Sequence, residues 1–151
     1  MNPYLEMLDA ASGIRLEPIE FIYTEQEIDW DNNWLRTLVT VKANDFSETY
    51  EANFLTLDFE RFKQELLLLN TDSCACAVFC GLEDQLEIAI TRATPDSFFV
   101  RIRSSDQVTN DAMPVSYELT LQQATLDVLI SQLQMITKAF PIRGDFTIKN
   151  S

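Results

Sequence analysis

The segment TEQEIDWDNNWL, residues 24–35, carries an acidic side chain at every second position: Glu25, Glu27, Asp29 and Asp31. Trp30 lies between the last two of them. Carboxylates at such spacing could bind a hard cation, act in acid–base catalysis, line a solvated strand or attract a basic partner. The choice among these four interpretations decides what can be predicted about function.

A calcium-binding loop is the sharpest of these possibilities to test. Starting at Asp29, the segment supplies oxygen ligands at loop positions one, three and five. An EF-hand loop also requires glycine at position six and a bidentate glutamate at position twelve. The sequence has Trp34 and Thr40 at these places. No EF-hand site is therefore predicted, and an irregular cation site remains open.

Catalytic patterns are missing from the sequence. The chain contains no histidine, the side chain most often used for proton transfer near neutral pH. It has no P-loop, no G-x-G-x-x-G and no G-x-S-x-G motif. The segment TDSCACAVFC holds all three cysteines, Cys74, Cys76 and Cys80, which we expect to be small buried residues of a core strand. We therefore predict a protein that is not an enzyme, with no cofactor and no bound metal.

Charge is strongly negative and unevenly distributed. The net charge is −13, and the first 60 residues contain 13 acidic and 3 basic side chains. Such a field repels nucleic acids and anionic membranes and attracts basic proteins. We expect a basic protein partner, no nucleic acid and no membrane. Without a signal peptide or a long apolar run, we expect a cytoplasmic location.

The acidic segment is therefore predicted to be part of a binding surface, because its charge exceeds what solubility requires. Trp30 beside the carboxylates would suit an interface anchor, since aromatic side chains often dominate binding energy. The predicted partner-binding residues are Glu25, Glu27, Asp29, Trp30 and Asp31. A merely solvated acidic loop remains the alternative, with residues 31–33 as a turn.

Apolar periodicity predicts the elements that must position this segment. Period-two stretches alternate with two helical stretches near residues 57–69 and 121–140, and no internal sequence repeat or linker is apparent. The helices carry Phe59, Phe62, Leu66 and Leu69, and then Leu126, Leu129, Ile130, Leu133, Ile136 and Phe140. We predict a single α+β domain over residues 1–151, with an antiparallel sheet of about six to eight strands and both helices packed on one face.

Three segments, DNNWL, FLTLDFERFKQELLLL and LDVLISQLQMITKAFP, occur in the order and spacing of the WapI family. The chain resembles this family over Ile19 to Pro141. Its members are presumed immunity proteins against wall-associated, contact-dependent bacterial toxins. The resemblance implies a small non-catalytic sheet-and-helix fold that neutralises a toxin by occlusion, and it assigns no binding residue. A small cation- or ligand-binding regulatory domain and an assembly subunit are the alternatives.

Overall fold

The computed structural model describes residues 2–23, 29–83, 85–105 and 115–144. The chain runs through two successive groups of four strands and a helix. The first group contains β1 (Leu5–Leu8), β2 (Ser12–Phe21), a short 3-10 helix η1 (Asp29–Asn33), β3 (Trp34–Ala43), β4 (Phe46–Leu55) and α1 (Thr56–Asn70). The second contains β5 (Cys76–Cys80), β6 (Leu86–Thr94), β7 (Ser97–Ser104), β8 (Val115–Gln122) and α2 (Gln123–Ala139).

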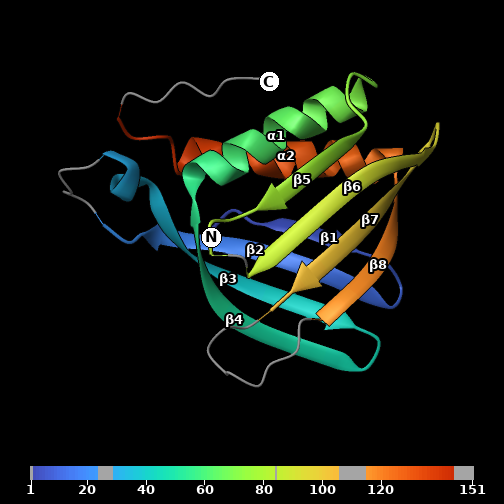
Figure 1. Cartoon of the computed structure of the whole chain (residues 1–151), viewed down its shortest axis with the longest axis horizontal. Helices are drawn as coiled ribbons and strands as arrows, with labels where there is room; N and C mark the ends of the chain where they lie inside the picture. Colours follow the sequence, from blue (N-terminus) through green and yellow to red (C-terminus); the bar gives the residue numbers. More distant parts are fainter. Residues whose placement is uncertain (1, 24–28, 84, 106–114, 145–151) are drawn as a thin grey trace.

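The α+β class and the antiparallel strands are confirmed, and the described residues form eight strands. These strands divide into two sheets of four, with the orders β1-β2-β3-β4 and β5-β6-β7-β8. Figure 1 shows the sheets facing each other with crossed strand directions, while α1 and α2 lie side by side above them. The helices therefore span both sheets rather than covering one continuous sheet.

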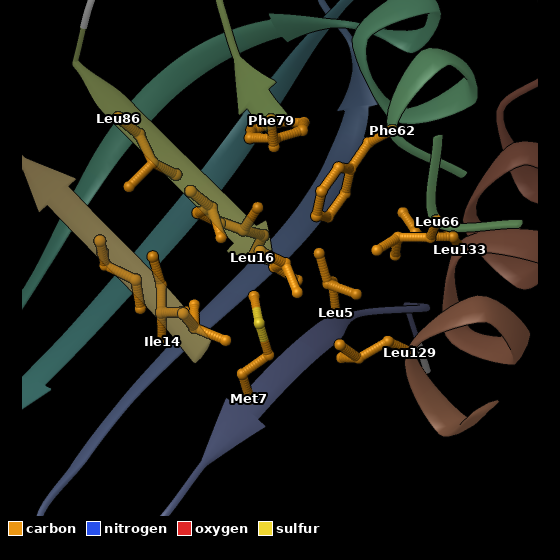
Figure 2. Packing of buried hydrophobic residues seen from close by; sticks show 14 of the residues in the cluster. Leu5, Met7, Ile14, Leu16, Phe62, Leu66, Phe79, Leu86, Leu129 and Leu133 are labelled. Atoms are coloured by element: carbon orange, nitrogen blue, oxygen red, sulfur yellow. The ribbon is translucent and has the colours of Figure 1, made fainter. Parts of the chain in front are cut away.

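Both predicted helices form where the apolar spacing places them. In α1 the inward stripe is Phe59, Phe62, Leu66 and Leu69, and all four side chains are fully buried. In α2 the predicted stripe is buried except for Phe140, which lies just beyond the helix and is half-buried. Figure 2 shows side chains from α1, α2, β1, β2, β5 and β6 converging, with Phe62 and Leu129 on either side of Leu5. One cluster of buried residues draws on both sheets and both helices.

The N-terminal strand β1 was not predicted, because only two of its four side chains, Leu5 and Met7, point inward. It pairs with β2 as far as Leu16, and Pro18 lies beyond that pairing. Proline therefore breaks no ladder bond to β1, as its missing N–H requires. The register of β2 with β3 shifts between Pro18 and Glu20.

The two ββββα halves, residues 5–70 and 76–139, repeat one architecture in detail. The four buried stripe residues of α1 recur in α2 exactly 67 positions later, as Leu126, Leu129, Leu133 and Ile136. The register of the first three strands matches too: Leu16 pairs with Leu5 and Val39, and Ile90 pairs with Ala77 and Val100. The second strand of each half carries its register shift at the corresponding place, after Pro18 and after Arg92.

A side chain of each helix accepts a hydrogen bond from the backbone of the first strand of the other half. The backbone N–H of Glu6 in β1 donates to Oε1 of Gln132 in α2 at 3.0 Å. The backbone N–H of Val78 in β5 donates to Oε1 of Glu65 in α1 at 3.3 Å. Glu65 and Gln132 are the tenth residues of their helices. A side-chain oxygen thus satisfies an outward N–H of a sheet edge at equivalent places, which blocks pairing with another strand.

The helices run antiparallel, so the start of each lies against the end of the other. Thr56, the first residue of α1, donates its hydroxyl hydrogen to the carbonyl of Phe140, just beyond α2. Gln123, the first residue of α2, donates through Nε2 to Oδ1 of Asn70 at 2.7 Å. These contacts tie the two halves together at both ends of the helix pair.

Candidate functional site

The predicted binding residues lie in the connection between β2 and β3. Glu25 and Glu27 lie outside the described residues. The next three, Asp29, Trp30 and Asp31, belong to η1, and the side chains of Trp30 and Asp31 are half-buried. The backbone forms the 3-10 helix η1 from Asp29 to Asn33, and residues 31–33, predicted as a turn, are the end of this helix.

A buried amide anchors the end of this connection. Asn33 is fully buried, and its Nδ2 donates to the carbonyl of Arg143 at 2.9 Å. Its Oδ1 accepts the backbone N–H of Arg143 at 2.8 Å. The side-chain amide therefore pairs with one residue of the C-terminal segment as a strand neighbour would. Breaking such a buried pair leaves two backbone groups unsatisfied, which costs more than the bonds contribute.

Aromatic contacts complete the anchor. The Arg143 guanidinium lies 3.6 Å from the ring centroid of Phe21, at the end of β2. The ring of Phe21 meets that of Phe140 edge to face, with centroids 5.5 Å apart. The N–H of Ile22 donates to the carbonyl of Trp34 at 2.9 Å, which closes the two ends of the connection. The acidic segment therefore begins and ends on fixed backbone.

An ion-pair group with two carboxylates and one cation lies on the neighbouring outer face of β2, β3 and β4. Arg36 lies between Glu51, at 3.0 Å, and Glu20, at 3.1 Å. Hydrogen bonds from Arg36 to Glu51 and to Glu20 raise the pKa of the guanidinium. Two carboxylates share one cation here, so the ion-pair group keeps a net negative charge. This face is continuous with the acidic connection, because Glu20 lies two residues before Ile22.

Asp58 is the most deeply buried carboxyl of the described residues, and its role is structural. Its Oδ2 accepts the N–H of Leu55 at 2.9 Å and so caps the start of α1. Burial raises the pKa of Asp58 to about 6, against the opposing effects of the Leu55 N–H and of Arg61, 3.9 Å away. With its side chain 3% exposed, Asp58 cannot meet a substrate without rearrangement.

The prediction that the three cysteines are buried in a core strand was wrong. Ala77 and Phe79 point inward on β5, whereas Cys76 and Cys80 face outward, half-buried and exposed respectively. Cys74 precedes the strand and is half-buried. Burial is the main cause that raises the pKa of the Cys76 and Cys80 thiols, which disfavours the reactive thiolate. Because side chains alternate between the two faces of a strand, an error of one residue in the expected inward positions assigned the cysteines to the wrong face.

Neither a cluster of possible metal ligands nor a membrane-spanning helix occurs in the part of the chain that the structure describes. Over the described residues, no group of three or more histidine, cysteine, aspartate or glutamate side chains could hold a metal ion. No helix within the described ranges has the length and apolar character needed to cross a membrane.

Comparisons with known proteins give one family and one fold. A sequence model of the immunity protein WapI-like family matches residues 7–141. A search of curated proteins finds no match. Among solved structures, the crystal structure of WHY1 from Arabidopsis thaliana is similar with a TM-score of 0.51 and 10% sequence identity. The similarity covers 93% of this chain and 91% of that one. At this identity the likeness concerns the fold alone.

Proposed function

Because the chain belongs to the immunity protein WapI-like family, we propose that it neutralises a cognate toxin by occlusion. In this proposal one toxin domain, basic on its binding face, docks on the acidic surface of the first half in the cytoplasm. The surface comprises the predicted residues Glu25, Glu27, Asp29, Trp30 and Asp31, together with Glu20 and Glu51 beside them. The chain supplies no catalytic group. Neutralisation follows from covering the active surface of the toxin.

The observation that carries the proposal is the length of the acidic connection. Twelve residues separate β2 from β3, whereas Pro95 and Asp96 alone join β6 to β7 in the other half. The same pair of strands therefore closes without such a segment. Since the fold does not require these residues, their charge calls for another reason, and a basic partner supplies one.

Electrostatic attraction of this kind acts mainly on the rate of encounter. Charges at the rim of an interface steer a partner of opposite sign and raise the association rate, whereas each exposed pair contributes only about 0.2–1 kcal/mol to affinity. The half-buried Trp30 is suited to stay in contact after encounter, where an aromatic side chain slows dissociation. An immunity protein benefits from rapid capture, because toxin molecules that are not yet bound remain active.

The test compares two variants of equal charge. In the first, Glu25→Gln, Glu27→Gln, Asp29→Asn and Asp31→Asn remove four negative charges from the acidic connection. In the matched control, Glu87→Gln, Asp96→Asn, Glu118→Gln and Asp127→Asn remove four from the second half. Stopped-flow association with the purified cognate toxin domain is measured at several salt concentrations.

We expect the first variant to associate about tenfold more slowly, with a weaker dependence on salt, while the control stays close to the unaltered protein. Equal slowing of both variants would mean that only net charge matters and would overturn the assigned surface. A toxin domain that stays active when saturated with the bound protein would overturn occlusion itself.

A further inference from the structure

A hollow of about 790 Å³ lies between the last turns of α2 and the residues that precede β1. Its walls are mostly apolar, and they are formed by Asn2, Pro3, Tyr4, Gln132, Met135, Lys138 and Ala139. Met135 is 64% exposed, although it is a large apolar side chain. The volume is within the range of about 300–1,000 Å³ that is usual for small-molecule sites.

In the other half, the chain itself passes along the helix at the corresponding place. There, residues 71–75 connect α1 to β5, and the N–H of Ser73 donates back to the carbonyl of Leu68 at 2.7 Å. Leu68 occupies the position in α1 that Met135 occupies in α2. No such connector joins α2 to β1, because beyond α2 the described chain leads away through Phe140 to Asn33. The described chain thus passes through this place in one half only.

One wall of the hollow is held rigidly. The Arg15 guanidinium lies 4.0 Å from the centroid of the Tyr4 ring. Arg15 is itself positioned by Glu6 and Glu17, at 3.6 and 3.8 Å. On the opposite side, Gln132 is fixed by the N–H of Glu6. A wall that is already ordered loses little entropy when a ligand binds, which favours affinity.

The charge of the hollow is opposite to that of the molecule. Among the described residues, Lys138 is the only charged one that lines the hollow, and it forms no ion pair with another described residue. No described acidic side chain lines the hollow. In a chain of net charge −13, an unpaired ammonium beside apolar walls is complementary to a ligand with an apolar body and one negative charge.

We propose that this hollow binds an amphipathic carboxylate, with the apolar body of the ligand against Pro3, Tyr4 and Met135 and its carboxylate beside Lys138. The site lies in a different part of the molecule from the acidic connection and does not depend on the proposed toxin binding. It gives the protein a small-molecule ligand of the aliphatic or aromatic acid class.

The experiment uses 11-(dansylamino)undecanoic acid and its methyl ester as probes, followed by dansyl fluorescence. The acid should bind the unaltered protein more tightly than the ester. Lys138→Met should weaken binding of the acid about 2- to 5-fold, as expected for an exposed charge pair, and leave the ester nearly unchanged. Met135→Asp should weaken both by about tenfold or more, since it places a carboxylate on the apolar wall.

Two matched variants control for charge and for folding. Lys42→Met removes an exposed cation from β3, and Val128→Asp adds an exposed carboxylate to α2 outside the hollow. Both should bind the acid as the unaltered protein does, and circular dichroism should show all four variants folded. Absence of binding at millimolar acid would overturn the proposal. Equal losses in the control variants, or no loss in Lys138→Met and Met135→Asp, would also overturn it.

Discussion

The two ββββα halves share the register of their first three strands, the bulge position and the helix stripe, yet they differ in charge and in their connections. Residues 5–70 contain 14 acidic and 5 basic side chains, a net charge of −9. Residues 76–139 contain 8 acidic and 4 basic side chains, a net charge of −4. The long connection follows the second strand in the first half and the third strand in the other.

Comparing the halves distinguishes the features that the fold requires from those that it does not require. Features present in both halves, such as the helix stripe and the sealed strand edges, are explained by packing and backbone hydrogen bonding. Features present in one half, such as the acidic connection and the open hollow beside α2, have no such explanation. We therefore assign the proposed functions to the parts in which the two halves differ.

The largest expected effect concerns the shared core. Phe62 and Leu129 are fully buried at equivalent positions of α1 and α2. We expect Phe62→Ala to lower the free energy of unfolding by about 3–5 kcal/mol and Leu129→Ala by about 2–5 kcal/mol. Urea denaturation measures both. A loss below 1 kcal/mol at only one of the two sites would show that the halves do not contribute equally to one core.

Asp58 sharpens the comparison, because the equivalent position in α2 is Thr125. The pKa of Asp58 is about 6 in the folded protein, above its ordinary value of 3.8. The folded state therefore retains a proton that the unfolded chain has lost, and stability falls as pH rises from about 4 to above 6. The contribution reaches up to about 3 kcal/mol.

We expect Asp58→Asn to remove this pH dependence, because the amide oxygen can still accept the N–H of Leu55. The difference in unfolding free energy between variant and unaltered protein, measured by urea titration, should grow in favour of the variant from pH 4 to pH 7. Thr125→Asn serves as the control and should show no such trend. A difference that stays constant with pH would refute the assignment.

Asn33 tests whether the acidic connection depends on its anchor. Asn33→Ala leaves the backbone N–H and carbonyl of Arg143 without partners, so we expect a loss of about 1–3 kcal/mol in unfolding free energy. Arg143→Ala keeps these backbone groups and removes only the contact with Phe21, which should cost about 0.5–1 kcal/mol. Thermal unfolding measures both losses. The anchor would be unimportant if Arg143→Ala cost more than Asn33→Ala.

The smallest expected effect concerns the sealed strand edges. Gln132→Ala should free the N–H of Glu6, and Glu65→Ala should free the N–H of Val78. Each change should cost about 0.5–1.5 kcal/mol. Amide hydrogen exchange should speed up at Glu6 in the first variant and at Val78 in the second, with the other amide unaffected. Exchange unchanged in both would mean that the helices do not protect these edges.

Sequence reasoning predicted the helices well because their apolar spacing is a local signal. It missed β1, whose four residues give too short a pattern, and it exchanged the faces of β5. It also found no repeat: along the 15 residues of α1, only Leu66 has an identical counterpart in α2, Leu133. A core position requires apolar volume rather than one particular residue type, so Phe59 and Leu126 can occupy equivalent positions.

Around the acidic connection, the sequence predicted only local backbone shape. The turn at residues 31–33 follows from Asp and Asn side chains, which favour turns. The anchor of Asn33 on Arg143 could not be predicted, because it joins residues 110 positions apart and no local pattern marks either of them. The hollow beside α2 was missed for a similar reason, since its walls come from opposite ends of the chain.

By itself, the sequence determined the elements, the α+β class and the excess of negative charge in the first half. These follow from side-chain periodicity and composition, which act over a few residues or over the whole chain. Only the tertiary structure decided how the eight strands divide into two sheets, that the halves repeat one framework, and where that framework is interrupted. Strand pairing and burial depend on contacts between distant segments, and those contacts exist only once the chain has folded.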